Sequence, residues 1–166
     1  MVGGSMTRTD VLEALTHVMD PEIPTLSLVD MGVITGVTVA EDGSVQVTMT
    51  PTFVGCPAID VMRSEAEAAV RALGVEKVTV EVNFDEPWTT NRLTEHGRQM
   101  LLKHGLAPPE PFDTTVELHL DVLNNTACPY CGSRNTTMKS PFGPTLCRSL
   151  HYCNACQQAF EGFKPV

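Results

Sequence analysis

Six cysteines are the residues of this 166-residue sequence whose type and spacing could do chemistry. Five of them fall within one stretch near the C-terminus, and four of these form two Cys-x-x-Cys pairs separated by 21 residues. Two intervening residues place two sulfurs on one tight turn, and two such turns supply the four thiolates of a tetrahedral metal site. The spacing therefore predicts a metal centre held by Cys128, Cys131, Cys153 and Cys156.

Zinc is the metal expected at this site, because it is redox-inert and accepts four sulfurs in a tetrahedron; iron is the alternative. A segment of about 40 residues is too small to be stable through its core alone, so the metal must supply much of its folding free energy. Cys147 lies between the two pairs and is an alternative ligand, although we prefer to interpret it as a small buried residue beside the site. The residues expected to form the core of this segment are Phe142, Leu146, Tyr152, Phe160 and Phe163.

The sixth cysteine, Cys56, stands alone in the rest of the chain. Pro57 suits the first position of a helix, which puts Cys56 at the expected N-cap, where backbone amides and the helix dipole favour a thiolate. Such a thiolate could attack an electrophile or bind a soft metal ion; the alternative is that Cys56 only fits a tight loop. Asp20 and Glu22 lie in an earlier loop that could approach the thiol in space, although carboxylates are more often solvated or capping residues.

The elements that must position these residues can be assigned from the spacing of apolar residues. Asp10, with Glu13 three residues later, is expected to cap the first helix, and a turn at residues 41–44 joins the first two strands. In chain order we expect a helix over 11–19, strands over 33–39 and 45–50, a helix over 57–73, a strand over 77–84 and a helix over 94–104. This order, α-β-β-α-β-α, predicts a two-layer α/β (α+β) domain whose third strand follows a crossover helix.

The charge is divided between an acidic body and a small basic tail. Residues 1–126 carry 7 Lys and Arg against 19 Asp and Glu, a net charge of −12, whereas residues 127–166 carry 4 against 1, a net charge of +3. A proline-rich stretch at residues 107–111 marks a stiff linker between them. The expected domains are an α/β domain over 8–107, a linker with a lead-in strand over 108–122, and a Cys-rich zinc-ribbon-like domain over 123–166.

Composition and missing motifs argue against several functional classes. No apolar run approaches the roughly 18–20 residues of a membrane span, and the start does not resemble a signal peptide, so we expect a cytoplasmic protein without a membrane partner. An acidic body repels phosphate backbones and aromatic residues make up only 5%, so nucleic-acid binding is not expected. The sequence has no Gly-x-Ser-x-Gly motif, phosphate-binding loop or dinucleotide fingerprint, which weakens a hydrolase or nucleotide-enzyme interpretation.

The body resembles the SufT-like iron–sulfur cluster assembly domain. The matching motifs are Asp-Pro-Glu-Ile-Pro at residues 20–24, Leu-Ser-Leu-Val-Asp-Met-Gly-Val-Ile at residues 26–34, and Gly-Cys-Pro at residues 55–57. In that family the cysteine that matches Cys56 is the reactive one, and the acidic loop is a hallmark. The resemblance implies that Cys56 is a reactive or cargo-holding thiol, with Asp20 and Glu22 in a supporting loop.

The tail resembles the PaaD family, also called PaaJ, of phenylacetate-degradation proteins, in residues 128–133, 140–147 and 152–164. Family members tend to carry a cysteine directly after a Phe-Lys pair, where Pro165 stands here; if that cysteine is a ligand elsewhere, Cys147 is its substitute in this chain. The resemblance implies a non-enzymatic accessory protein that matures the metal centres of the phenylacetyl-CoA epoxidase complex. Its partners would be subunits of that complex, especially the iron–sulfur reductase, and a homodimer is a further expectation.

Three hypotheses follow from these observations. In the preferred one, Cys56 transiently holds an iron–sulfur cluster or iron, and the ribbon is a structural or docking module for the client. The second is a zinc-stabilised interaction scaffold of the epoxidase complex without metal cargo. The third, a thiol-dependent enzyme with Cys56 as nucleophile, ranks last because the body has no evident base or resolving cysteine.

Overall fold

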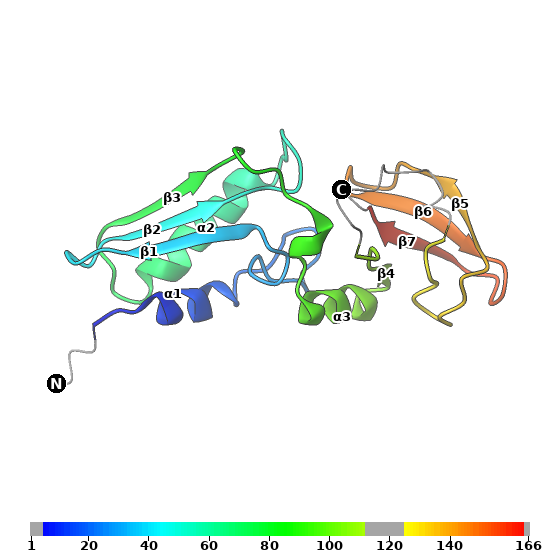
Figure 1. Ribbon diagram of the computed structural model, residues 1–166, viewed down its shortest axis with the longest axis horizontal. Helices are drawn as coiled ribbons and strands as arrows, with labels where there is room; N and C mark the ends of the chain where they lie inside the picture. Colours follow the sequence, from blue (N-terminus) through cyan, green and yellow to red (C-terminus); the bar gives the residue numbers. More distant parts are fainter. Residues whose placement is uncertain (1–4, 112–124, 165–166) are drawn as a thin grey trace. The chain divides into compact units, whose positions relative to one another are not determined.

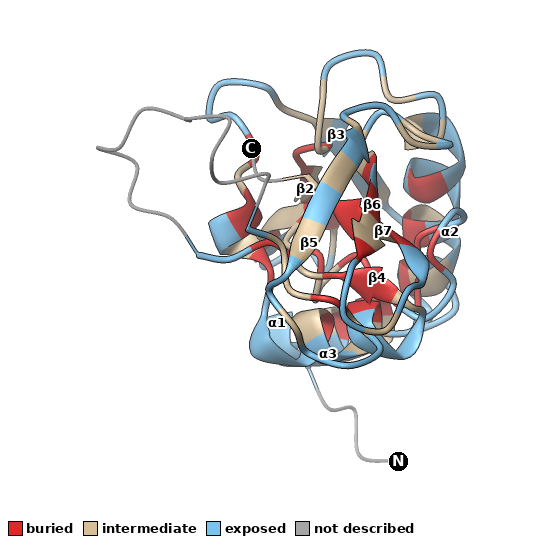
Figure 2. Cartoon of the chain, turned by 90° about the vertical axis from the view of Figure 1, so that its right-hand side faces the viewer, coloured by how far each residue is buried: buried red, intermediate tan, exposed pale blue. Residues whose placement is uncertain are grey.

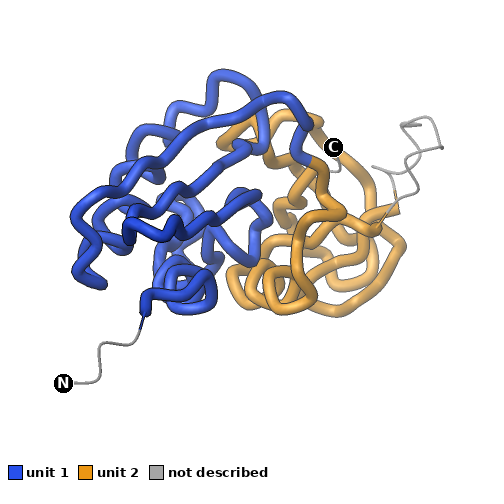
Figure 3. The backbone as a smooth tube through the Cα atoms, turned by 60° about the vertical axis from the view of Figure 1, so that its left-hand side comes forward, with its two compact units in different colours: residues 1–88 blue, residues 89–166 orange. Residues whose placement is uncertain are grey.

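The computed structural model describes residues 5–111 and 125–164, and it separates into two compact units, residues 1–88 and 89–166 (Figure 3). The elements of the first unit are α1 (Arg8–Leu15), β1 (Ile34–Val39), β2 (Val45–Met49), α2 (Ile59–Arg71) and β3 (Val78–Val82). Those of the second are the 3-10 turn η1 (Thr90–Arg92), α3 (Glu95–Lys103), β4 (Leu106–Ala107), β5 (Thr136–Ser140), β6 (Arg148–Cys153) and β7 (Ala159–Phe163). The predicted order α-β-β-α-β-α is confirmed.

The first unit is a three-stranded sheet with the order β1-β2-β3, on which two helices pack (Figure 1). β1 and β2 form the expected antiparallel hairpin, and β3 runs parallel to β2 after the crossover through α2. Alternate residues of β2 are buried, which is the pattern of a strand with one face covered. Along α2 the buried residues Met62, Ala66 and Val70 recur every four positions between exposed or half-buried ones, so the helix presents one face to the core (Figure 2).

The cap of α1 differs from the expected one. Thr7, not Asp10, is the N-cap: its hydroxyl accepts a hydrogen bond from the Asp10 amide at 3.2 Å. The Asp10 carboxylate in turn accepts from the Thr7 hydroxyl at 2.6 Å and from the Thr7 amide at 2.8 Å, and these two bonds lower the pKa of Asp10. The capping box is therefore made by Thr7 and Asp10, because the same residue pattern is satisfied three residues earlier than the expected pair of Asp10 and Glu13.

The second unit is a four-stranded sheet with the order β4-β7-β6-β5, in which β4 runs parallel to β7 and the other pairs are antiparallel. The compact units divide after Trp88, whereas the sequence placed the boundary after residue 107. The pairing of β4 with β7 explains the difference, because it joins α3 and its following strand to the ribbon. Trp88 belongs to the first unit, where its indole donates to the Met31 carbonyl at 3.0 Å. The expected lead-in strand, within 108–122, falls largely outside the described residues.

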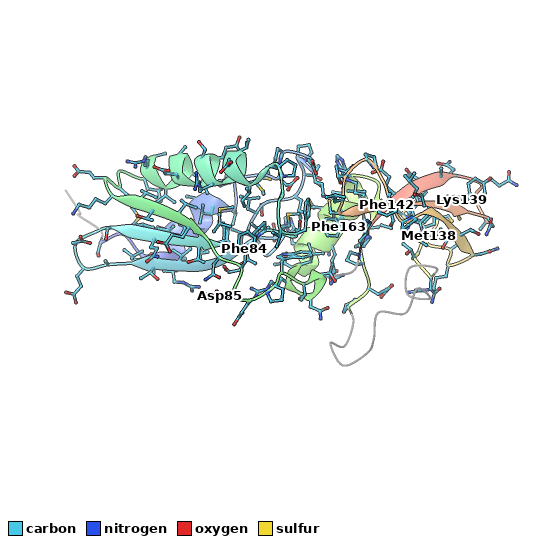
Figure 4. All side chains as sticks on the ribbon, turned by 90° about the horizontal axis from the view of Figure 1, so that it is seen from above. Phe84, Asp85, Met138, Lys139, Phe142 and Phe163 are labelled. Carbon is cyan, nitrogen blue, oxygen red and sulfur yellow. The ribbon has the colours of Figure 1, made fainter. Side chains whose placement is uncertain are left out.

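Three apolar residues are more exposed than the sequence predicted (Figure 4 labels two of them). β3 ends at Val82, before Phe84, which is 50% exposed because a turn closed by the Asn83 side chain and the Asp85 amide ends the strand. Phe142 and Leu146 are 69% and 63% exposed, so the prediction that they belong to the ribbon core is wrong. They lie on the β5–β6 connection, whose backbone forms local hydrogen bonds, such as that from the Gly143 amide to the Arg148 carbonyl. Phe160 and Phe163 are buried as expected.

Among the helices of the described residues, none combines the length and the apolar character needed to cross a lipid bilayer.

We predict that Thr7→Ala lowers the free energy of unfolding by about 1 kcal/mol, because it removes the side chain that caps the first turn of α1. Thr9→Ala is the matched control, since Thr9 lies inside the same exposed turn and alanine has the higher helix propensity. Urea unfolding followed by circular dichroism measures both. Equal destabilisation by the two substitutions would contradict the assigned cap.

Candidate functional site

Four cysteine sulfurs of the second unit lie within 4.8 Å of one another: those of Cys128, Cys131, Cys153 and Cys156. The Sγ atoms of Cys128 and Cys156 are 3.7 Å apart, and those of Cys131 and Cys153 are 3.6 Å apart. Four sulfurs that each bind a central ion at about 2.3 Å in a tetrahedron are separated by about 3.8 Å. The four sulfurs are therefore close enough together for one metal ion to bind all of them.

The two Cys-x-x-Cys turns hold these sulfurs through their own backbone. In the first, the Gly132 amide donates to the Cys128 carbonyl at 2.9 Å, and Gly132 has φ 74, a conformation that favours glycine. In the second, the Cys156 amide points at the Cys153 sulfur, 3.5 Å away. Each turn thus brings its pair of sulfurs together locally, and the pairing of β5, β6 and β7 brings the turns together.

The pKa values of the clustered thiols indicate that a cation is required to deprotonate all four of them. Hydrogen bonds from the amides of Cys156 and Ala155 lower the pKa of Cys153 to about 7. Desolvation, followed by the neighbouring sulfurs, raises the pKa of Cys156 to about 12. Four thiolates this close repel one another, so all four are deprotonated together only when a cation neutralises them. Metal binding here displaces thiol protons, and this donor set suits zinc or iron.

Cys147, the alternative ligand from the sequence, and the nearby His151 are outside the four-cysteine group. The Cys147 sulfur lies 3.1 Å from the Thr145 hydroxyl. His151 is buried, its Nε2 is 2.8 Å from the Ser149 hydroxyl, and its ring stacks on Phe160. Burial lowers the pKa of His151. These contacts agree with a packing role for both residues.

Cys56 lies two residues before the N-cap of α2, not at the N-cap itself. The helix begins at Ile59 with Ala58 as its cap, because residues 57 and 58 still belong to a turn that follows Gly55. Gly55 has φ 84, which redirects the chain into this turn. Cys56 is half-buried and so retains access to solvent.

The surroundings of Cys56 favour the thiol, which is opposite to the expectation from the helix dipole. Burial raises its pKa; hydrogen bonds from the amides of Ala58 and Ile59 lower it, and the negative charges of Asp20 and Glu22 raise it again. The net direction is upward from 9.0, so the group is protonated at neutral pH. A bound cation would instead favour the thiolate. It would displace the thiol proton, and the two carboxylates would stabilise its positive charge.

The acidic loop is held in place by its own hydrogen bonds. Asp20 is 6% exposed, and its Oδ1 accepts from the amides of Glu22 at 2.8 Å and Ile23 at 2.9 Å. The Asp20 amide donates to the Leu26 carbonyl, which closes the loop. The structure thus brings Asp20 and Glu22 into electrostatic reach of Cys56, as the sequence suggested. Within residues 5–111 and 125–164, however, these three do not form a compact ligand set like the four cysteines.

The sequence does not identify which backbone amides donate hydrogen bonds to the cysteine sulfurs and lower their pKa values. Those of Ala155 and Cys156 act on Cys153, and those of Ala58 and Ile59 act on Cys56. No residue type identifies such donors, because every residue except proline carries an amide. Only the turn conformation decides which amide points at a sulfur.

Two family models match the chain. One, described as "PaaD zinc beta ribbon domain", matches residues 110–164, and the other, "Iron-sulfur cluster assembly protein", matches residues 8–82. The first match contains the four-cysteine cluster and the second contains Cys56 with the acidic loop.

Curated relatives align with the whole chain or with its first part. A protein of Escherichia coli K12, named as a subunit of a "Putative 1,2-phenylacetyl-CoA epoxidase", is 34% identical over 157 residues, which are 95% of this chain and 92% of that protein. The "Fe-S protein maturation auxiliary factor" of Porphyromonas gingivalis is 37% identical over 90 residues, 54% of this chain and 85% of that protein.

Solved structures resemble the first part in fold and sequence. The crystal structure of a domain of unknown function, DUF59, from Bacillus anthracis has a TM-score of 0.52 at 26% identity and covers 56% of this chain and 89% of that one. A conserved hypothetical protein from Thermotoga maritima has a TM-score of 0.51 at 36% identity and covers 61% and 97%.

We predict that the purified chain holds about one zinc ion, and that Cys153→Ser abolishes this occupancy because it removes one of four ligands. Cys147→Ser is the matched control and keeps the zinc, since Cys147 lies outside the cluster. Elemental analysis measures the metal, and amide NMR spectra report whether the ribbon stays folded. Equal zinc loss in both variants would make Cys147 a ligand.

We also predict that alkylation of Cys56 by iodoacetamide rises with pH through a midpoint above 9, because the thiol must first ionise. Asp20→Asn combined with Glu22→Gln should lower this midpoint, since it removes two negative charges while the new amide oxygen at position 20 can still accept the loop hydrogen bonds. Peptide mass spectrometry, read at Cys56 alone, gives the rate at each pH. A midpoint near neutral pH would contradict the assigned environment.

Proposed function

Because this chain belongs to the PaaD family, in which an iron–sulfur cluster assembly domain precedes a zinc β-ribbon, we propose that it is an accessory factor of iron–sulfur cluster assembly whose Cys56 carries the cargo. The observation that carries this proposal is a half-buried, solvent-accessible thiol within electrostatic reach of Asp20 and Glu22. Relatives that share this domain are named as maturation auxiliary factors, which supports a role in assembly and not in catalysis.

The surroundings of Cys56 also explain how cargo binding at this sulfur can be reversible. Binding of an iron-containing cargo displaces the Cys56 proton, and the carboxylates of Asp20 and Glu22 offset the positive charge. On release the sulfur takes a proton back, which its raised pKa favours at neutral pH. A single sulfur ligand binds metal more weakly than four do, so cargo at Cys56 can exchange while the ion in the ribbon remains bound.

We propose that the ribbon has two roles, permanent zinc binding and docking to the client. Exposed Phe142 and Leu146 support the docking role, because apolar residues on a hydrogen-bonded turn form a ready-made contact surface. Lys164 lies 5.1 Å from the Phe142 ring centroid and adds positive charge to this surface. The client we propose, from the name of the Escherichia coli relative, is the phenylacetyl-CoA epoxidase complex, with its iron–sulfur reductase as the first partner to examine. This activity requires a reducing, cytoplasmic setting, in which the thiols stay free.

The alternative function is a zinc-stabilised scaffold of the same complex that carries no cargo. The specific observation that favours it is the protonated state of Cys56 at neutral pH, together with the lack of a compact three-ligand set around it in the described residues. Both functions use the ribbon in the same way, so only cargo binding at Cys56 separates them.

We predict that Cys56→Ser lowers anaerobic iron uptake by the body and slows cluster transfer to an apo-ferredoxin acceptor by about tenfold or more, because a hydroxyl is a poor ligand for iron. Zinc in the ribbon should be unchanged. Visible absorption during reconstitution and the rate of acceptor loading provide the measurements.

Cys147→Ser is the control for removal of a thiol outside both sites, and it should transfer at the parent rate. If Cys56→Ser takes up and transfers a cluster as well as the parent does, the carrier function is wrong. If the parent itself holds zinc but never holds iron, the scaffold function replaces it.

A further inference from the structure

A pocket of about 510 Å³ lies wholly within the second unit and is not part of either cysteine site. Its walls come from the turn between α3 and β4, from Tyr130 in the first Cys-x-x-Cys turn, and from strands β5, β6 and β7. Leu150 of β6 pairs with Glu161 of β7, so their side chains share one face of the sheet. The pocket therefore uses a face of the ribbon sheet as one wall.

Much of this wall is apolar. Leu106 is buried in the pocket lining, while Leu150 is 37% exposed and Ala159 is exposed beside it on β7. Gly105, with φ 82, has no side chain to occupy the space next to the Tyr130 hydroxyl, where a Cβ would come within 3.5 Å. The pocket volume is large enough for a fused aromatic ring system, whose own volume is about a third of that of the pocket.

The charged groups of the lining favour an anion. Arg148 pairs with Glu161 at 2.9 Å, and their side chains are only 12% and 30% exposed, so this pair is fixed and internally neutral. Lys139 lines the same pocket from β5 and adds a positive charge that the pair does not offset. Its ammonium lies 5.5 Å from the Tyr152 ring centroid, which orients it over the same strands.

From this combination we propose that the pocket binds a small organic anion with a flat apolar body. The body lies against Leu106, Leu150 and Ala159, and the anionic group faces Lys139. This site is independent of cargo binding at Cys56. Because Tyr130 stands between Cys128 and Cys131, a bound anion also contacts the turn that holds the metal.

Two matched probes test the proposal with the full-length, metal-loaded chain: 2-naphthoate, which is an anion, and 2-naphthamide, which has the same shape without the charge. We expect saturable 1:1 binding of 2-naphthoate that is about fivefold tighter than that of 2-naphthamide, the effect of one partly solvated charge contact. Isothermal titration calorimetry gives the affinities. Amide chemical shifts should change at residues 104–106, 148–151 and 159–161. A chain that binds neither probe, or binds both equally, overturns the proposal.

Two variants locate the site. Lys139→Met keeps the apolar stem and should remove the preference for 2-naphthoate, whereas Lys103→Met, on α3 outside the pocket, should leave it unchanged. Ala159→Phe fills the pocket from an exposed strand position and should weaken both probes by about tenfold, with zinc content as the check on folding. Unchanged binding in Ala159→Phe, or equal effects of the two lysine variants, would place the anion elsewhere and overturn the site. Iron uptake at Cys56 is a separate readout, so this test does not depend on the proposed function.

Discussion

Repulsion among four sulfurs is the constraint on which the ribbon depends. Sulfur atoms 3.6 and 3.7 Å apart cannot all be thiolates without a cation, yet the fold holds them at these distances. Two of the sulfurs belong to the small buried cluster of this unit, together with Ala107 and Phe160. β4 and β7 both contribute a residue to this cluster, so two of the four sulfurs lie in the packed interior of the unit.

The same side chain serves two different purposes in the two units. In the ribbon, amide hydrogen bonds lower the pKa of Cys153, and four sulfurs lie close enough together to bind one metal ion. In the first unit, burial and the negative charges of two carboxylates keep a single sulfur protonated at neutral pH. The number of neighbouring sulfurs and the local charge, not the residue type, therefore distinguish the two cysteine environments.

The first unit supplies the fixed frame for that single sulfur. The parallel pairing of β2 with β3 requires the crossover through α2, and the turn that starts this helix carries Cys56. The loop that contains Asp20 is closed by hydrogen bonds at both ends, which keeps its carboxylates near the thiol. Cys56 is thus partly accessible beside a loop whose backbone is hydrogen-bonded.

The sequence by itself determined the features that depend on local spacing: the two Cys-x-x-Cys turns, the order of helices and strands, and the β1–β2 hairpin. Covalent geometry and side-chain period set these, so neighbouring residues suffice to predict them. Only the tertiary structure decided the direction of the Cys56 pKa, the exposure of Phe142 and the place where the units divide. Each of these depends on which distant segments pack together, because burial and charge act through space and not along the chain.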